Sequence, residues 1–332
     1  MGCKIHSIEY YLPENVLTNE DIGRMHPEWS AGKIEKKLGI RKRHIVAENE
    51  TALDLALKAG EKILKDYDRS KIDFVMLCTQ SPDYFLPTSA CILQDKLGLK
   101  KTCGAFDFNL GCSGYVYGLA IVKGLIAAGI ARSVLLIMSE TYSRHMHPGD
   151  ISNRSIFGDA ASATIIEYSD KEHILEFDLG TDGSGMNNLI VPNGCFRNPC
   201  TPNAPIITDD SGNIRTDNNL YMNGPEIFNF TIDSVPVVIE NVLRKNKTEK
   251  SLIDHFILHQ ANKYMLGYLM KKMDLPEDKF YNNLLDTGNT VSSTIPIALK
   301  NLHDENKIKS GDKLLLCGFG VGYSWGGAVI IW

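Results

Sequence analysis

The sequence predicts an α/β protein whose sheets are covered by helices on both faces. Short apolar runs alternate along the chain with segments in which apolar residues recur every three to four positions. The runs are continuous, which is typical of strands buried on both faces, and the periodic segments are typical of helices that pack on a sheet. The same order of elements recurs in the second half of the chain, which is the further observation behind this fold class.

The predicted elements follow one another in a regular order. In the first half, a helix is expected at residues 52–67 and a strand at 72–79, then a helix at 114–128 and strands at 133–139 and 161–168. In the second half, a helix is expected at residues 225–245 and a strand at 253–258, then a helix at 262–273 and strands at 313–317 and 327–332.

One long segment, residues 181–223, interrupts this pattern. It is dense in Gly, Asn, Pro and Asp and has little periodicity. A loop of this length inside a compact domain is usually functional. We therefore interpret it as the wall or lid of a pocket.

An internal repeat predicts two related halves, residues 1–170 and 171–332. Residues 70–80 (SKIDFVMLCTQ) parallel residues 251–260 (SLIDHFILHQ), and in each half a glycine-containing turn and a further strand follow. If a pseudo-two-fold axis relates the halves, the turn at Cys112 and the turn at Asn289 face each other. His259, at the carboxyl end of its strand, would lie in the same crevice, where open α/β sheets bind ligands.

The composition excludes several classes of function. The chain has 332 residues, of which 43% are hydrophobic, and a net charge of −5, which offers nucleic acid no attraction as a whole. No apolar stretch is long enough to span a bilayer, and the N-terminus has no apolar signal core, so a cytoplasmic protein is expected. No metal site is expected either, because Cys195 and Cys200 have no second pair to complete a zinc site.

Cys112 is the first candidate for a catalytic residue. It lies in Gly111-Cys112-Ser113-Gly114, where a strand-like segment gives way to the helix expected at 114–128. A thiol at this corner would sit at a helix N-terminus, where unpaired N–H groups and the helix dipole favour the thiolate. We therefore expect a nucleophile here.

His259 and Asn289 are the expected partners of Cys112. A cysteine can attack a thioester carbonyl, and a neutral histidine can accept the thiol proton or donate a hydrogen bond. Asparagine does not titrate near neutral pH, so it can only orient a group or donate to an oxyanion. A nucleophile with two neutral donors suits decarboxylative carbon–carbon bond formation, which needs donors at the enolate oxygen and no base. The glycines of 318–327 would let backbone N–H groups approach a reacting oxygen.

Six blocks of the chain resemble 3-oxoacyl-acyl carrier protein synthase III, a family of condensing enzymes in the thiolase superfamily. The resemblance runs nearly end to end, and the blocks are GIRKR (39–43), FDFNLGCSG (106–114), FGDAA (157–161), HQAN (259–262), GNT (288–290) and GFGVG (318–322).

The resemblance implies an α/β, thiolase-like αβαβα fold of five layers and a homodimer. It also implies a ping-pong Claisen condensation, in which Cys112 takes an acyl primer and malonyl-acyl carrier protein (malonyl-ACP) extends it. No cofactor is implied beyond coenzyme A or the phosphopantetheine of ACP, which carry the substrates.

The resemblance also assigns roles to residues of this chain. The catalytic residues are Cys112, His259 and Asn289, and the oxyanion hole is formed by the backbone N–H groups of Cys112 and Val321. The expected substrate contacts are Leu86, Phe157, Phe319, Lys37 and Arg154. The expected docking residues for the acidic carrier protein are Lys263, Lys271 and Lys272.

Three departures from the best-known members of the family concern substrate binding. Lys33 stands where they carry a tryptophan that stacks on the adenine of coenzyme A, and Trp29 lies ten residues before Gly39. Leu86 replaces a bulky aromatic of the primer pocket. The arginine upstream of Phe-Gly-Asp is displaced to Arg154. These changes favour a specialised branch with a different or carrier-bound acyl donor over an acetyl-CoA primer.

Three alternatives stay open at this point. An acyltransferase of the same fold could pass the Cys112-bound acyl group to an oxygen or nitrogen acceptor. A cysteine hydrolase is the alternative from another class, because papain-like proteases also carry Cys, His and Asn in this order. A non-enzymatic partner subunit is the third, although such subunits usually lose the nucleophile, which this chain retains.

Overall fold

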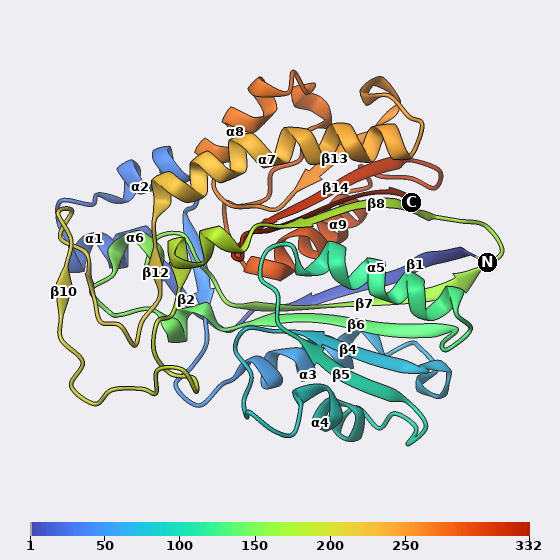
Figure 1. Cartoon of the computed structure of the whole chain (residues 1–332), viewed down its shortest axis with the longest axis horizontal. Helices are drawn as coiled ribbons and strands as arrows, with labels where there is room; N and C mark the ends of the chain where they lie inside the picture. Colours follow the sequence, from blue (N-terminus) through green and yellow to red (C-terminus); the bar gives the residue numbers. More distant parts are fainter. Residues whose placement is uncertain (1) are drawn as a thin grey trace.

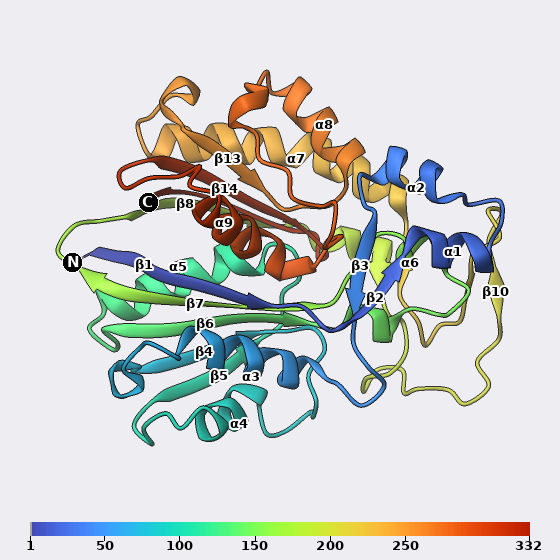
Figure 2. The same cartoon turned by 180° about the vertical axis from the view of Figure 1, so that it is seen from behind.

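Five layers of alternating helices and sheets make up the molecule. A computed structural model describes residues 2–332. Two sheets lie between three layers of helices (Figures 1 and 2). The outer helices are α7 (Gly224–Lys245) and α8 (Lys263–Lys272) on one side and α3 (Ala52–Ile63) and α4 (Ser89–Lys96) on the other, and the inner helices are α5 (Gly114–Ala127) and α9 (Thr294–Asp304). The predicted αβαβα fold is confirmed.

The two sheets have matching strand orders. The first runs β1 (Gly2–Tyr11), β7 (Ala160–Ser169), β6 (Ser133–Glu140), β4 (Phe74–Cys78) and β5 (Gly104–Phe108). The second runs β8 (Ile174–Thr181), β15 (Ser324–Ile331), β14 (Lys313–Gly320) and β13 (His255–Leu258). A single parallel bridge from Phe256 to Phe280 occupies the place that β5 has in the first sheet. In both sheets the two pairings nearest this end are parallel, β5–β4 and β4–β6 in the first sheet and the Phe280 bridge and β13–β14 in the second. The remaining pairings are antiparallel.

All the strands and helices expected from periodicity are present, with shifted ends. The helix expected at 52–67 ends at Ile63, and the strand expected at 313–317 extends to Gly320. The residues expected to form a glycine-rich loop at 318–327 instead belong largely to the antiparallel pair β14–β15. Sequence patterns missed several further elements, among them β1, β8 and α9. The two strands lack a continuous apolar run, whereas α9 does carry apolar residues at helical spacing.

The inner helix α5 explains why the core is continuous across both sheets. Its sequence GYVYGLAIVKGLIA is apolar on nearly every side, and a helix of this kind is stable only when it is surrounded by protein. Tyr115, Leu119 and Val122 are fully buried, and the helix contacts strands of both sheets. The position of α5 thereby fixes the residues before its N-terminus deep inside the molecule.

A smaller group of elements covers the end of the sheets where the strands of the parallel pairs finish (Figure 2). It contains β2 (Asn15–Thr18), β3 (Lys42–Ile45), α1 (Asn19–Met25), α2 (Ala31–Leu38) and α6 (Ile151–Arg154). The segment predicted as a long loop adds the short strands β9 (Leu189–Ile190), β10 (Ile207–Thr208), β11 (Ile214–Arg215) and β12 (Tyr221–Met222). The β10–β11 hairpin is held by a hydrogen bond from Ile214 N–H to the Gly149 carbonyl.

Among residues 2–332, no helix is both long enough and apolar enough to cross a membrane.

Candidate active site

Cys112 lies at the turn between β5 and the N-terminus of α5. The turn is closed by a hydrogen bond from Gly114 N–H to the Gly111 carbonyl, and α5 begins at Gly114. The neighbouring Ser113 does not cap the helix with its side chain, because its hydroxyl bonds that of Ser324 at 2.6 Å. Cys112 is buried, with 6% of its surface exposed.

The thiol of Cys112 is held in its protonated form in the substrate-free pocket. Burial is the main cause that raises the pKa of Cys112 to about 12, and the charge of Glu140 adds to the shift. The expectation that the helix N-terminus would favour the thiolate is therefore wrong for this state. Nucleophilic attack by Cys112 needs a group that removes the proton.

Glu140 is a buried group that sequence reasoning missed. Its carboxylate accepts hydrogen bonds from the backbone N–H of Gln80 at 2.9 Å and from the Ser81 hydroxyl at 3.2 Å. Burial nevertheless raises the pKa of Glu140 well above its usual range. Its position after the apolar run of β6 was the available signal, because strand ends in this fold point toward the site.

His259 and Asn289 are brought together by two separate segments. His259 follows β13, and its N–H donates to the Cys317 carbonyl of the neighbouring strand. Asn289 is tied to the Phe157 segment, because Asn289 N–H donates to the Ile156 carbonyl and Gly158 N–H donates to the Asn289 carbonyl. The Asn289 side-chain amide nitrogen and His259 Nε2 are 3.3 Å apart. Burial lowers the pKa of His259 to about 3, so its ring is neutral at physiological pH.

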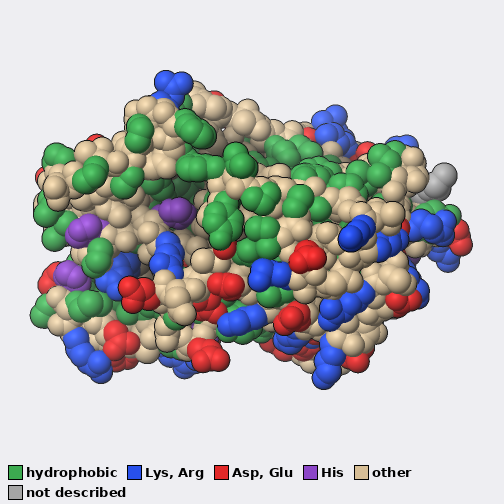
Figure 3. Space-filling model, turned by 90° about the horizontal axis from the view of Figure 1, so that it is seen from below, with side chains coloured by type: hydrophobic (Ala, Val, Ile, Leu, Met, Phe, Trp, Pro, Cys, Tyr) green, Lys and Arg blue, Asp and Glu red, His purple; other side chains and the backbone are tan. Residues whose placement is uncertain are grey.

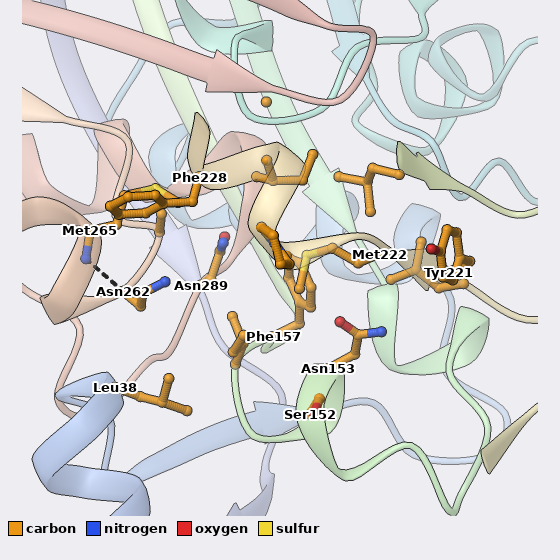
Figure 4. Close-up of a pocket in the computed structure, with 18 of the residues that line it drawn as sticks. Leu38, Ser152, Asn153, Phe157, Tyr221, Met222, Phe228, Asn262, Met265 and Asn289 are labelled. Carbon is orange, nitrogen blue, oxygen red and sulfur yellow. Dashed lines mark hydrogen bonds between the residues drawn. The ribbon is translucent and has the colours of Figure 1, made fainter. Parts of the chain in front are cut away.

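One cavity of about 770 Å³ brings the three predicted catalytic residues onto a common wall. Cys112, His259 and Asn289 all line it. Figure 4 shows Asn289 between Phe157 and Phe228, with Leu38, Tyr221 and Met222 around the remaining space. The side chains therefore come from both sheets and from the covering elements at this end.

The structure brings only some of the predicted substrate contacts to this cavity. Lys37, Phe157 and Phe319 line it, and the rings of Phe319 and His259 meet edge-on at 5.5 Å. Arg154 lines a separate hollow of about 250 Å³ on the other side of Phe157. Leu86 is 82% exposed and does not line the cavity of its own chain.

The remaining predicted residues lie around the cavity. The side chain of Val321 packs with the apolar cluster that contains Cys112. The proposed docking residues Lys263, Lys271 and Lys272 are exposed on α8. Trp29 lines the mouth of the cavity, and the Lys37 ammonium lies 5.9 Å from the centre of its ring.

Two glycines of β14 have a clear steric function beside Cys112. A Cβ atom on Gly318 would lie 2.7 Å from the Cys112 carbonyl oxygen, and one on Gly320 would lie 3.0 Å from Cys112 Sγ. Real Cβ atoms essentially never come as close as the first distance, and the second is tighter than nine in ten of their contacts. Glycine is therefore required because the strand passes directly against the nucleophile turn.

Within residues 2–332, no group of three or more His, Cys, Asp or Glu side chains is arranged to hold a metal ion. The chemistry that the cavity offers is that of a buried thiol, a neutral imidazole and an amide.

Comparisons with known proteins agree on one family. A family model described as 3-oxoacyl-[acyl-carrier-protein (ACP)] synthase III matches residues 106–183, and the model of the C-terminal part of the same enzyme matches residues 243–332. A beta-ketoacyl-[acyl-carrier-protein] synthase III of Halalkalibacterium halodurans is 35% identical over 99% of this chain and 96% of its own length.

Solved structures give the same result. A 3-oxoacyl-(acyl-carrier-protein) synthase III crystal structure superposes with a TM-score of 0.98 at 48% identity, with all of both chains covered. The priming beta-ketosynthase of the R1128 polyketide pathway superposes with a TM-score of 0.85 at 25% identity, over 99% of this chain and 96% of the other.

Proposed function

Because this chain belongs to the 3-oxoacyl-[acyl-carrier-protein] synthase III family, we propose that Cys112, His259 and Asn289 carry out its two half-reactions. The protein is an acyltransferase that condenses an acyl thioester with malonyl-ACP and belongs to fatty-acid-related or specialised biosynthesis. The observation that supports the residue assignment is the single cavity whose wall carries all three side chains.

In the first half-reaction, Cys112 attacks the carbonyl of an acyl thioester. A bond forms between Sγ and the carbonyl carbon, the bond to the carrier sulfur breaks, and the thiol proton passes to the departing carrier thiolate. His259 is neutral and lines the same cavity, so it can transfer this proton. The backbone N–H groups of Cys112 and Val321 are the proposed donors to the oxyanion.

In the second half-reaction, malonyl-ACP loses carbon dioxide and the resulting enolate attacks the acyl-Cys112 carbonyl. Loss of carbon dioxide leaves negative charge on the malonyl thioester oxygen, where a fixed donor stabilises the transition state. The Asn289 amide nitrogen is directed toward the imidazole of His259 and can donate to that oxygen. Attack on the acyl carbon breaks its bond to Cys112 Sγ and releases a thiolate, which takes up a proton from water to restore the resting thiol.

The carrier proteins and coenzyme A are proposed to enter at the cavity mouth near Trp29 and Lys37. The helix α8 begins at the cavity wall, since Asn262 and Tyr264 at its start line the cavity. We assign Lys263, Lys271 and Lys272 to the docking of acidic ACP, and Phe157 and Phe319 to the primer. Because Arg154 faces the second hollow, it is not assigned to the carrier.

We also propose that the protein is a homodimer in which two copies pair along β5. This strand ends its sheet, and the hydrogen bond from Gly104 N–H to Asp73 turns the N–H of Ala105 away from β4. The face seen in Figure 3, on the β5 side of the molecule, gathers many hydrophobic side chains. Exposed Tyr84, Phe85 and Leu86 are the apolar residues that a partner would cover.

Two further assignments complete the proposal. The matching strand orders support two duplicated halves, residues 1–170 and 171–332, that each supply part of the site. The eight cysteines are free thiols, the form that a reducing cytoplasm maintains, which supports a cytoplasmic location. The substrates are carried by coenzyme A or by ACP phosphopantetheine, and no further cofactor is proposed.

Intact-mass measurement of the protein after incubation with a panel of acyl-CoA and acyl-ACP thioesters tests this function. The expected result is a gain of one acyl mass that Cys112→Ala abolishes. Adding malonyl-ACP should then discharge the acyl group into a 3-oxoacyl-ACP. If no thioester acylates Cys112, the assignment is wrong, and discharge only by an alcohol or amine would indicate an acyltransferase to oxygen or nitrogen.

A further inference from the structure

A closed chain of hydrogen bonds connects His259 and Asn289 to the backbone N–H and carbonyl of a single residue, Val291. The Val291 N–H donates to Asn289 Oδ1 at 2.9 Å, and the Thr294 hydroxyl donates to the Val291 carbonyl at 3.0 Å. Between these ends, Asn289 Nδ2 lies 3.3 Å from His259 Nε2, and His259 Nδ1 lies 2.8 Å from Thr294 Oγ1. All the side chains in this chain are buried.

The groups at the two ends of this hydrogen-bond chain determine which atom donates in each of its hydrogen bonds. The Asn289 oxygen must face the Val291 N–H, so Nδ2 is the atom that faces the imidazole, and Nδ2 can only donate. His259 Nε2 therefore accepts and carries no proton. The proton of the neutral ring is then on Nδ1, and it is donated to Thr294 Oγ1, whose own hydrogen is donated to the Val291 carbonyl.

The backbone at Val291 is distorted to make this chain. Its φ is 55°, in the left-handed region that β-branched residues strongly disfavour. Such strain persists where the surroundings demand it, often at functional sites. Here the conformation aims both the N–H and the carbonyl of one residue at side chains of the catalytic group.

We propose that Thr294 is a positioning residue that holds the proton of His259 on Nδ1, so that Nε2 carries no hydrogen and can receive the Cys112 proton when its bond from Asn289 is released. This inference rests on the proposed function of Cys112 and His259. The two side chains then have different roles in the two half-reactions. His259 acts as proton acceptor in acylation, and Asn289 is the neutral donor to the enolate oxygen in decarboxylation.

The proton transfers of the acylation half-reaction balance without any other reagent. During acylation the Cys112 thiol proton moves to Nε2 as the Sγ–carbon bond forms, and His259 becomes an imidazolium that still donates from Nδ1 to Thr294. The Nε2 proton then moves to the departing carrier thiolate as its bond to carbon breaks. The imidazole returns to the form with hydrogen on Nδ1, and Asn289 Nδ2 is free to turn to a malonyl thioester.

The decisive experiment compares Thr294→Val, which is nearly isosteric but cannot accept from Nδ1, with Thr294→Ser, which retains the hydroxyl. Histidine nitrogens labelled with ¹⁵N report the tautomer by NMR, and a His259→Gln protein identifies the His259 signals. The wild-type protein and Thr294→Ser should carry the proton on Nδ1. Thr294→Val should shift population to the Nε2–H form and slow Cys112 acylation by about ten- to a hundredfold.

A second measurement separates positioning from a structural role. Malonyl-ACP decarboxylation is followed on protein that has already been acylated to completion. It should change by less than about threefold in Thr294→Val, because the Asn289 donor is retained. The inference is overturned if both half-reactions slow equally, or if the wild-type His259 carries its proton on Nε2. The wild-type spectrum decides the point even if Thr294→Val does not fold, and a wild-type Cys112 that accepts no acyl group would refute the proposed function instead.

Discussion

At the scale of single residues, Cys112 illustrates how burial outweighs a helix terminus. A helix N-terminus stabilises a nearby negative charge by about 0.3–1 kcal/mol, which is less than one unit of pKa. Burial of an ionisable group can shift its pKa by about 3–5 units. Since Cys112 is buried before α5, desolvation decides, and the pKa of the thiol rises to about 12. Deprotonation must therefore be coupled to substrate attack.

The first prediction concerns the pH dependence of Cys112 alkylation. Because the pKa of Cys112 is about 12, the thiolate fraction grows about tenfold per pH unit throughout the working range. Iodoacetamide labelling of Cys112, followed by peptide mass spectrometry, should thus accelerate steadily from pH 7 to pH 10. A rate that levels off below pH 9 would mean that the resting pocket does stabilise a thiolate.

The second prediction concerns Asn289. Replacing its amide with a carboxylate in Asn289→Asp removes the donor to the enolate oxygen and should reduce malonyl decarboxylation by about 10²–10³-fold. Acylation of Cys112, measured separately by intact mass, should slow less, by about ten- to a hundredfold, because a carboxylate facing Nε2 favours the Nε2–H form of His259. Asn262→Asp is the matched control, since it adds the same charge to the cavity wall and keeps the N-cap of α8. An equal loss in both variants would indicate a general effect of charge.

At the scale of elements, the β14 strand limits what can stand next to Cys112. Its last residues pass so close to the nucleophile turn that two of them must be glycine. In the sequence these glycines resemble a flexible loop. In the fold they are part of an antiparallel pair with β15, and their lack of a side chain serves close packing.

The third prediction follows from this contact. A methyl group in Gly320→Ala would lie 2.9 Å from Cys112 Cβ, so urea unfolding should report a loss of about 1–3 kcal/mol, together with slower acylation. Gly267→Ala on α8 is the control, because its Cβ would meet no atom within 4 Å and alanine favours a helix by about 1 kcal/mol. If Gly320→Ala is as stable as the wild type, the strand can move away from the turn.

The fourth prediction concerns α8 as the docking element. Lys271→Glu reverses an exposed charge on this helix, and exposed ion pairs contribute about 0.2–1 kcal/mol, so KM for malonyl-ACP should rise up to about fivefold. The rise should diminish at high salt because added ions screen the interaction. Acylation from acyl-CoA should change little. Lys65→Glu, on the opposite half of the chain, should leave KM for malonyl-ACP unaltered, and an equal rise there would contradict docking on α8.

At the scale of the whole molecule, the main unpaired feature of a single copy of the chain is the outer edge of β5, which has no neighbouring strand within residues 2–332. A sheet edge with free N–H groups invites a further strand, and exposed aromatic residues near it favour a permanent partner. Phe85 and Phe196 contact each other with ring centres 5.2 Å apart and ring planes tilted by 36°, although both are largely exposed. A second copy would cover them and continue the sheet.

The fifth prediction tests this assembly. Analytical ultracentrifugation of the wild-type chain of 36.9 kDa should give a particle of about twice that mass. Ala105→Pro removes the outward N–H of β5 and, combined with Leu86→Asp, should give monomers. Val237→Asp, which alters an exposed apolar residue on α7, is the control and should leave the dimer intact. A monomeric wild-type protein would refute the pairing along β5.

The sequence alone determined the architecture and supplied the proposal for the reacting groups. Apolar runs and helical periodicity predict the elements because burial on a layered fold imposes those patterns. Cys112, His259 and Asn289 could be chosen because their chemistry and order are specific. The apolar pattern and the residue types belong to each segment by itself. They can therefore be read from the sequence without knowing which residues pack against that segment.

Only the tertiary structure decided how those groups behave. The raised pKa of Cys112, the steric need for Gly320, the position of Leu86 and the link from His259 to Thr294 all depend on residues that are distant in the sequence. Desolvation and hydrogen-bond polarity are set by the atoms that surround a group in space. Thr294 is an ordinary helix residue in the sequence, and only the closed chain through Val291 gives its hydroxyl a role in the proton transfers of His259.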